Sequence, residues 1–577
     1  MDYSKLAPSL AMAYDEYAEG RQELADHVQE DQMPGFVAPR DFAKPARVVV
    51  TLECSPDADF SDLEGTTGIE VNAGGERVRT AIVPLSDLPA LTQYPGVERV
   101  APAQRVHPLM DVAPGKVGLP AFRTNNQLTG KGVIIGVVDS GIDARHPAFA
   151  GRLLRIWDQE ARGGAGVPEG RYGIEYADTA DLAKSKDDHG HGTHVAGIAA
   201  GSDSKFQGVA PEADVVVVKT NMTNVGIIDG IQYVFRLARE LGKAAVVNLS
   251  LGGHSDPHDG TDAVSKAIDD ESGPGRIVCC AAGNEGEDNI HAQLAPQPGE
   301  TLRVPCLHSP DRDGVVQELW FNGWYAGSDE VEVAVAAPEG LTTPFQGILP
   351  NGPQGNPNKV SQLGDWRVQI GTPGPDSRNQ DHQFTVRLRP PVNATGSRTW
   401  TLLVRGKKAA HQTTRVDVWA LGDGRFSGPH ATNSMTIGSP GTATSAITVA
   451  AYTTRTRWTD IDGTSREASW LKPDDIAPFS SLGPRRDGKA KPDLAAPGAM
   501  IVSAQSRDSR NSRRWMIDQN HVAMQGTSMA APFAAGAVAL LLSHDGTLDP
   551  AKALSTFAYK QEPDADTWGR GLIDFPG

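Results

Sequence analysis

The fold is decided by a stretch that begins with GVIIGVVDSG at residues 132–141 and alternates runs rich in Val and Ile with helical segments. Unbroken apolar runs between helices are typical of strands buried on both faces of a parallel sheet. The stretch therefore predicts an α/β fold in which helices sandwich a mostly parallel sheet. The segments that follow the first run are HGTHVAGIAAG (191–201), ADVVVVK (213–219), a helix near 227–241, AAVVNLSLGG (244–253), a helix near 262–268 and RIVCCAAGN (276–284).

Two regions around this stretch have other patterns. Between residues 46 and 108, the strand-like segments RVVVTLEC, RVRTAIVP and VERVAP with one short helix predict a small α+β domain. From about 291 to 430 the helical patterns vanish, and short alternating segments separated by Pro, Gly and Asn turns predict an inserted β-sandwich. The βα pattern resumes at 445–452 and ends with a helix of small residues after Ser528.

These changes of pattern divide the chain into six expected parts. The first carries helix formers and acidic residues until Met33–Gly35 break the pattern, and the third is rich in Pro and Gly, which suits an exposed linker. The parts are an N-terminal extension (1–40), the α+β domain (41–110), the linker (111–131), the first half of the α/β domain (132–290), the inserted β-domain (291–430) and the second half of the α/β domain (431–577).

Composition excludes several classes of function. A chain of 577 residues has room for three or four domains of about 150 residues. Its net charge of −17 argues against nucleic acid or an anionic membrane as partner. Apolar runs such as 534–542 are much shorter than the roughly 20 residues that cross a bilayer, so no membrane span is expected.

The N-terminus and the cysteines indicate the compartment. Acidic residues stand where a signal peptide would carry a basic and then an apolar segment, which predicts a cytoplasmic protein. Four cysteines are too few for the disulfide framework of a secreted protein, so we expect all of them to be reduced, with Cys279 and Cys280 packed in the core. A disulfide between Cys54 and Cys306 is the alternative.

Four polar residues stand at the ends of buried elements, where α/β sheets place their functional sites. Asp139 follows a strand, and His191 stands between glycines that allow close approach of the backbone. Ser528 opens a helix, whose free amides and dipole favour developing negative charge. Asn284 follows another buried strand and offers an amide donor to an oxyanion.

The surrounding segments DSGID, HGTHVAG, AAGNEG and GTSMAAP, in this order, resemble those of the subtilisin-type serine peptidases, the subtilase family. The segments GVAPEADVVVVK, NLSLGG, SPGTATSAITVAAY and KPDLAAPG agree with this likeness across the α/β part. The region ahead of it is similar to the inhibitory prodomain of the family. The resemblance implies a serine endopeptidase that acts on proteins or peptides, made as a zymogen and self-processed, with its own prodomain as intramolecular inhibitor.

The resemblance also implies a role for each residue. His191 would take the proton of Ser528 as the hydroxyl attacks, and Asp139 would fix the imidazole tautomer. The Asn284 side chain and the Ser528 amide would hold the oxyanion. The walls of the pocket for the side chain preceding the cut would be Ser250, Leu251, Gly252 and Gly253 on one side and Ala281, Ala282 and Gly283 on the other.

Several other interpretations concern neighbouring residues. His189, His191 and His194 with Asp187 and Asp188 could form a metal cluster, but they lack the spacing of known zinc helices, so no metal or cofactor is expected. His194 is interpreted as a buried structural residue, and Asp187 and Asp188 as solvated loop charges. The family's calcium site is expected to be absent, because HPAF at 146–149 has no carboxylate.

A narrower likeness concerns the inserted region. LRIWDQ at 154–159 together with the β insertion resembles the clostridial spore-germination proteases, whose inserted domain is a jelly roll. Trp320, Trp324 and Tyr325 are expected to pack inside this domain instead of binding substrate. Two alternatives stay open: a catalytically silent binding protein that uses the β insertion, and an enzyme that transfers the acyl group to an amine instead of water.

Overall fold

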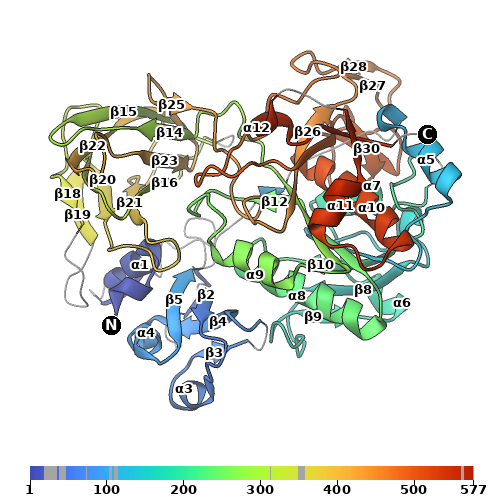
Figure 1. The fold of residues 1–577 in the computed structure, drawn as a ribbon, viewed down its shortest axis with the longest axis horizontal. Coiled ribbons are helices and arrows are strands. Elements are labelled where there is room, and N and C mark those ends of the chain that lie inside the picture. Colours follow the sequence, from blue (N-terminus) through green and yellow to red (C-terminus); the bar gives the residue numbers. More distant parts are fainter. Residues whose placement is uncertain are drawn as a thin grey trace.

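The structure is a computed structural model of the chain (Figure 1). It describes residues 1–18, 36–37, 47–72, 75–102, 107–108, 115–203, 205–311, 314–348, 358–560 and 564–575. The predicted pattern break at Met33–Gly35 lies outside these residues.

A ten-stranded sheet forms the centre of the largest part of the molecule. Neighbouring strands are parallel except for the two edge pairs β32–β33 and β8–β9. The predicted mostly parallel sheet is therefore confirmed. In spatial order the strands are β32 (Ala558–Lys560), β33 (Leu572–Asp574), β29 (Leu494–Ala499), β26 (Ile447–Thr453), β13 (Arg276–Ala281), β11 (Ala245–Leu249), β7 (Ile134–Asp139), β10 (Asp214–Lys219), β8 (Leu153–Asp158) and β9 (Ile174–Tyr176).

Helices cover both faces of this sheet. On one face, α7 (His191–Ala200) and α10 (Thr527–His544) pack with alternate strand residues such as Ile135 and Val137. On the other, α8 (Asn224–Leu241) and α9 (Ala263–Glu271) pack with Ile134 and Val138. Because successive residues of a strand point to opposite faces, the unbroken apolar runs serve both cores. Cys279 and Cys280 likewise lie in opposite cores, as expected.

One helix among the described residues, α10, is long and apolar enough to cross a bilayer by length and composition, and 83% of it is buried inside the molecule. This burial is that of a core helix, with apolar residues on all sides.

The N-terminal region contains the predicted α+β domain. Strands β2 (Arg47–Cys54), β4 (Val78–Pro84) and β5 (Val97–Pro102) match the expected segments, and β4 and β5 both pair antiparallel with β2. Helix α1 (Pro8–Ala18), in the expected extension, lies between β5 and the inserted region (Figure 1). The other elements are η1 (Tyr3–Lys5), β1 (Phe36–Val37), α3 (Ser61–Thr66), β3 (Glu70–Val71), η2 (Leu85–Asp87) and α4 (Leu88–Gln93).

The inserted region consists of two antiparallel sheets that share one apolar core. Trp324 and Tyr325 are buried, as expected, whereas Trp320 is only partly buried. One sheet has the order β19 (Asn358–Leu363), β20 (Trp366–Gly371), β21 (His382–Arg389), β16 (Leu319–Tyr325), β23 (Val416–Leu421), β14 (His291–Leu294), β25 (Ala431–Thr432), and the other β18 (Gln346–Gly347), β17 (Glu330–Ala336), β22 (Arg398–Lys408), β15 (Thr301–His308), β24 (Gly424–Phe426).

The structure corrects the expectation of an exposed linker between the α+β domain and the α/β domain. Its second half contains the helix α5 (Leu119–Asn126), and Val117 and Leu119 are fully buried. Pro120 stands in the first turn of this helix, where its missing N–H costs nothing. The segment is held by the C-terminal end of the chain, since the Phe575 amide donates to the Val117 carbonyl. Pro and Gly therefore mark a helix boundary here and not a free linker.

The smaller elements are β6 (His107–Pro108), η3 (Gly115–Val117), η4 (Pro147–Phe149), α6 (Thr179–Leu182), β12 (Leu251–Gly252), β27 (Arg457–Thr459), β28 (Ser465–Glu467), β30 (Ile501–Ala504), β31 (His521–Met524), α11 (Pro550–Thr556) and α12 (Ala565–Trp568).

Candidate active site

The structure brings Asp139 and His191 together. Asp139 is the last residue of β7 and His191 the first of α7, and both side chains are fully buried. His191 Nδ1 lies 2.6 Å from Asp139 Oδ1, which also accepts a hydrogen bond from the Ser140 amide. This contact fixes the imidazole with its proton on Nδ1 and leaves Nε2 as the basic nitrogen.

A glycine makes this approach possible. A Cβ atom on Gly192 would lie 2.2 Å from the Gly141 carbonyl oxygen, so no other residue fits at the second position of α7. Gly190 precedes the helix with a φ of +86°. The expected close approach of the backbone at these glycines is thus observed.

Asp187 corrects one expectation, because it is fully buried and not a solvated loop charge. It accepts hydrogen bonds from the Gly190 and Thr193 amides, both at 2.8 Å, and from the hydroxyls of Thr193 and Ser140. The free amides at the start of α7 need an acceptor, and Asp187 supplies it. Its neighbour Asp188 is exposed, as expected.

Ser528 is the second residue of α10, which packs against α7. Its hydroxyl donates to the Ser250 carbonyl oxygen at 2.9 Å, and the Ser250 hydroxyl donates to the Ser528 carbonyl oxygen at 2.6 Å. The structure therefore joins Ser528 to the first residue of the predicted pocket wall. In the role that the family resemblance implies, this hydroxyl would have to turn from Ser250 towards His191.

Asn284 lies beside the start of α10. Its Oδ1 accepts hydrogen bonds from the Thr527 amide at 3.0 Å and the Thr527 hydroxyl at 3.1 Å. These contacts orient the amide so that its NH₂ group is the end available to an oxyanion. Thr527 was not predicted to orient Asn284, although it directly precedes Ser528 in the GTS segment.

The two predicted pocket walls border one cavity of about 840 Å³, which Leu251, Gly252 and Gly253 line on one side and Ala281, Ala282 and Gly283 on the other. The Gly253 amide donates to the Ser439 carbonyl, which fixes the end of the first wall. Strand β6 pairs antiparallel with β12, and His107 lies opposite Gly252 and Pro108 opposite Leu251. The backbone of the chain itself thus covers the first predicted wall.

In the part of the chain that the structure describes, the neighbouring histidines and cysteines do not form a metal site. No group of three or more His, Cys, Asp or Glu side chains there could hold a metal ion. His194 is buried, as expected, with Nε2 at 3.2 Å from the Val522 carbonyl, and burial lowers its pKa well below the usual value. All four cysteines are free and buried, which excludes the Cys54–Cys306 alternative.

Comparison with known proteins agrees with the resemblance to the subtilase family. The model of the subtilase family matches residues 130–309 and 391–560, which leaves the middle of the insertion unmatched. The "Intracellular serine protease" of Paenibacillus polymyxa is 35% identical over 193 residues, which is 32% of this chain and 52% of that protein. The "Major intracellular serine protease" of Bacillus subtilis is 32% identical over 226 residues, 37% of this chain and 63% of that protein. The matched region thus spans about half to two thirds of these relatives.

Among solved structures, the Clostridium perfringens CspB protease has a similar fold, with a TM-score of 0.63 and 24% identity over 79% of this chain and 96% of that one. Since the family model covers more than half of the sequence and matches both halves of the central sheet, the chain belongs to the subtilase family of serine peptidases.

Proposed function

We propose that the chain is a serine endopeptidase that hydrolyses peptide bonds of protein substrates through an acyl-enzyme. The buried contact of His191 Nδ1 with Asp139 Oδ1 at 2.6 Å carries the proposal, because it prepares Nε2 as a general base. His191 would accept the proton of Ser528 Oγ as that oxygen bonds to the substrate carbonyl carbon. The Asn284 amide and the Ser528 backbone N–H would stabilise the oxyanion.

The same groups complete the reaction. His191 would return the proton to the leaving amine as the peptide C–N bond breaks. A water molecule, deprotonated by the imidazole, would then attack the ester and release the acid. No cofactor is required by this sequence of steps.

A fluorophosphonate probe tests the proposal. The processed protein, separated from its N-terminal fragment, should be labelled at Ser528 and should hydrolyse a peptide library, whereas Ser528→Ala should not be labelled. A protein freed of its N-terminal domain that is neither labelled nor active on any peptide would favour the silent binding protein. Mass spectrometry of the products in the presence of an amine distinguishes hydrolysis from acyl transfer.

The chain is also proposed to be a zymogen inhibited by its N-terminal α+β domain. An extended segment that pairs with a wall strand binds as a substrate does, by adding a strand. The pairing of β6 with β12 supports this, because it lays the backbone of His107 and Pro108 along the first predicted pocket wall. Ser250 directly precedes β12 and accepts the hydrogen bond of the Ser528 hydroxyl, so the proposed cleavage site follows Pro108, near residue 110.

The first prediction concerns this processing site. Purified natural protein should give two bands, and the N-terminal sequence of the larger one should begin near residue 110. Ser528→Ala should remain a single band, because the proposed nucleophile is absent. Identical band patterns for the two proteins, or a mature terminus far from residue 110, would contradict self-processing at this position.

The relatives named intracellular support a cytoplasmic location for this protein. Fractionation of the producing cells with an antibody to the chain tests it.

A further inference from the structure

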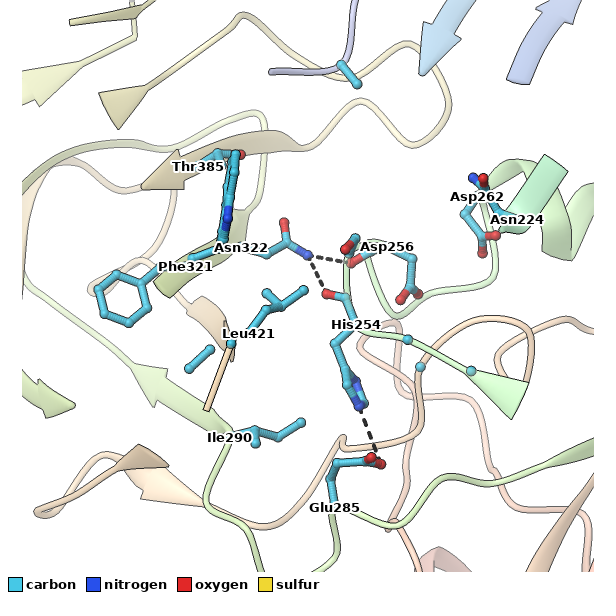
Figure 2. Close-up of a pocket in the computed structure, with 18 of the residues that line it drawn as sticks. Asn224, His254, Asp256, Asp262, Glu285, Ile290, Phe321, Asn322, Thr385 and Leu421 are labelled. Carbon is cyan, nitrogen blue, oxygen red and sulfur yellow. Dashed lines mark hydrogen bonds and ion pairs between the residues drawn. The ribbon is translucent and has the colours of Figure 1, made fainter. Parts of the chain in front are cut away.

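The cavity bordered by the two predicted pocket walls does not end within the α/β domain. Its far side is formed by Phe321 and Asn322 of β16 and Leu421 at the end of β23, all in the inserted region, and by Ile290 directly before β14. Figure 2 shows Leu421 and Ile290 facing His254 and Glu285 across this space. The inserted region therefore forms part of the lining of this cavity.

We propose that the inserted β-region forms the far wall of the pocket that takes the side chain preceding the cut, and so determines which side chains fit. The proposal rests on the proposed peptidase function and deepens it. Leu421 and Ile290 are the proposed selectivity residues, and Asn322 is the proposed positioning residue.

Asn322 ties the insertion to the pocket wall. It is nearly buried, and its Nδ2 donates to the His254 carbonyl at 3.0 Å and the Asp256 carbonyl at 2.8 Å (Figure 2). Its Oδ1 accepts from Trp324 Nε1 at 2.8 Å and Gln383 Nε2 at 3.0 Å. Both ends of the amide thus form hydrogen bonds. Asn322 of the insertion fixes the loop that begins directly after the wall residue Gly253.

Stacked rings make this junction rigid. The rings of His254 and His258 are nearly parallel, with centroids 5.3 Å apart. His258 stacks on Trp419 of β23 at 3.7 Å, and His291 of β14 stacks on the same indole at 4.6 Å. A row of four packed rings across the junction supports a fixed wall, since close-packed interiors do not deform continuously.

The chemistry of the two sides indicates the side chain. On the near side, His254 Nε2 lies 3.4 Å from Glu285 Oε2, which also accepts hydrogen bonds from the backbone N–H of Asn284 at 2.6 Å and from the Ser481 hydroxyl at 3.0 Å. Burial alone would lower the pKa of His254, but Glu285 outweighs it and raises that pKa. The carboxylate is therefore neutralised within the protein and is not left to bind a cation.

The far side is apolar at Ile290, Leu421 and Phe321. A large apolar side chain that reaches this wall gains burial that a small one does not. The pocket thus fits a Leu, Met or Phe side chain.

The test compares peptide substrates that differ only in the residue before the cut, Ala, Leu or Phe, using the processed natural protein and its variants. In Leu421→Trp, the indole fills the far end of the cavity, so kcat/KM for Leu and Phe should fall at least about tenfold relative to Ala. Leu421→Ala should change the ratio in the opposite direction and serves if the Trp variant does not fold. Val360→Trp, at an exposed position of β19 in the same region, is the matched control and should leave the ratio unchanged.

Asn322→Leu keeps the branched shape of the side chain and removes its hydrogen bonds, including the two to the loop. It should raise KM for the Phe substrate by about tenfold and leave the Ala substrate within about threefold. An equal loss with both substrates would make Asn322 merely structural and overturn its positioning role.

The outcomes separate the two proposals. A natural protein that hydrolyses peptides, combined with an unchanged Leu, Phe and Ala ratio in both Leu421 variants, would overturn the far wall and leave the peptidase function intact. A processed natural protein that has been separated from its N-terminal fragment and still hydrolyses none of the substrates would overturn both.

Discussion

Asp187 connects the segments that carry Asp139 and His191, the proposed catalytic aspartate and histidine. Its carboxylate accepts a hydrogen bond from the Ser140 hydroxyl at 2.8 Å. The Ser140 Oγ in turn accepts a hydrogen bond from the Gly192 backbone amide at 2.9 Å. Through these bonds one buried carboxylate holds both the segment after Asp139 and the first turn of α7. Removal of such an acceptor leaves several donors without a partner in the interior.

The second prediction follows from this network. Asp187→Ala should lower the free energy of unfolding by about 2–3 kcal/mol and reduce kcat more than tenfold, because the imidazole loses its fixed position. Urea unfolding and peptide hydrolysis measure the two effects. Asp188→Ala, at the exposed neighbouring position, is the control and should stay within about 0.5 kcal/mol. Equal behaviour of the two variants would contradict the role of Asp187.

At this scale the sequence could predict most of the site. Asp139, His191, Asn284 and Ser528 were expected because each stands in a short segment with its own neighbours. Asp187 was not recognised, since an acidic residue in a Gly-rich loop is usually exposed. Its burial depends on amides of α7 and a hydroxyl after β7, and this three-dimensional demand for acceptors is not visible in the sequence.

At the scale of elements, α8 and the N-terminal strand β4 share a buried carboxyl group. Asp229 of α8 accepts hydrogen bonds from the Thr80 hydroxyl of β4 at 2.9 Å and from the Tyr172 hydroxyl at 2.6 Å. Burial raises the pKa of Asp229 to about 8, and the nearby Glu169 carboxylate adds to the shift. Since an exposed aspartate has a pKa near 4, docking of β4 on α8 is linked to uptake of a proton.

The third prediction concerns this linkage. A raised pKa in the folded chain means that stability is fully present at about pH 4 and is lost as the pH rises through about 8. In the uncut Ser528→Ala chain, Tm should therefore fall by several degrees from about pH 5 to about pH 8.5. Adding Asp229→Asn should remove much of that slope, because an amide does not titrate. Parallel curves for the two proteins would contradict the assignment.

Elements were predictable where the pattern is local. The runs that became β7, β10, β11 and β13 were recognised because strands buried on both faces must be continuously apolar. Helix α5 was not, because Pro120 and the glycines around it indicate turns until a partner is known. Its stability comes from contacts such as the ring pair Phe122–Phe575, 5.1 Å apart, between distant parts of the sequence.

At the scale of the whole molecule, a buried network of charges joins the N-terminal domain to the other two parts. Arg99 of β5 lies 2.6 Å from Asp376 of the inserted region, which also contacts Arg378 at 2.8 Å. Glu53 of β2 contacts Lys266 of α9 at 2.7 Å. Burial alone would raise the pKa of Asp376, but the two arginines outweigh it and hold that pKa well below its usual range.

The bounds of these parts could be predicted from the sequence, but the contacts between them could not. Changes of periodicity distinguish the α+β domain, the α/β domain and the insertion, because each pattern is local. Which surfaces meet depends on pairs such as Arg99 and Asp376, and nothing in the sequence around either residue indicates its partner.

The last prediction concerns the cut molecule. After cleavage at the proposed site, the N-terminal fragment should remain bound to the rest of the chain and co-elute with it in size-exclusion chromatography. Asp376→Asn leaves Arg99 buried without its counter-charge, which costs about 3–5 kcal/mol and weakens the complex by roughly two to four orders of magnitude. Glu339→Gln removes the exposed partner of Arg398 in the same inserted region and should change nothing, since exposed ion pairs contribute little. If the fragment of the Asp376 variant stays bound on dilution as tightly as that of the natural protein, the buried network does not hold the N-terminal domain, and its strand pairing with β12 must do so instead.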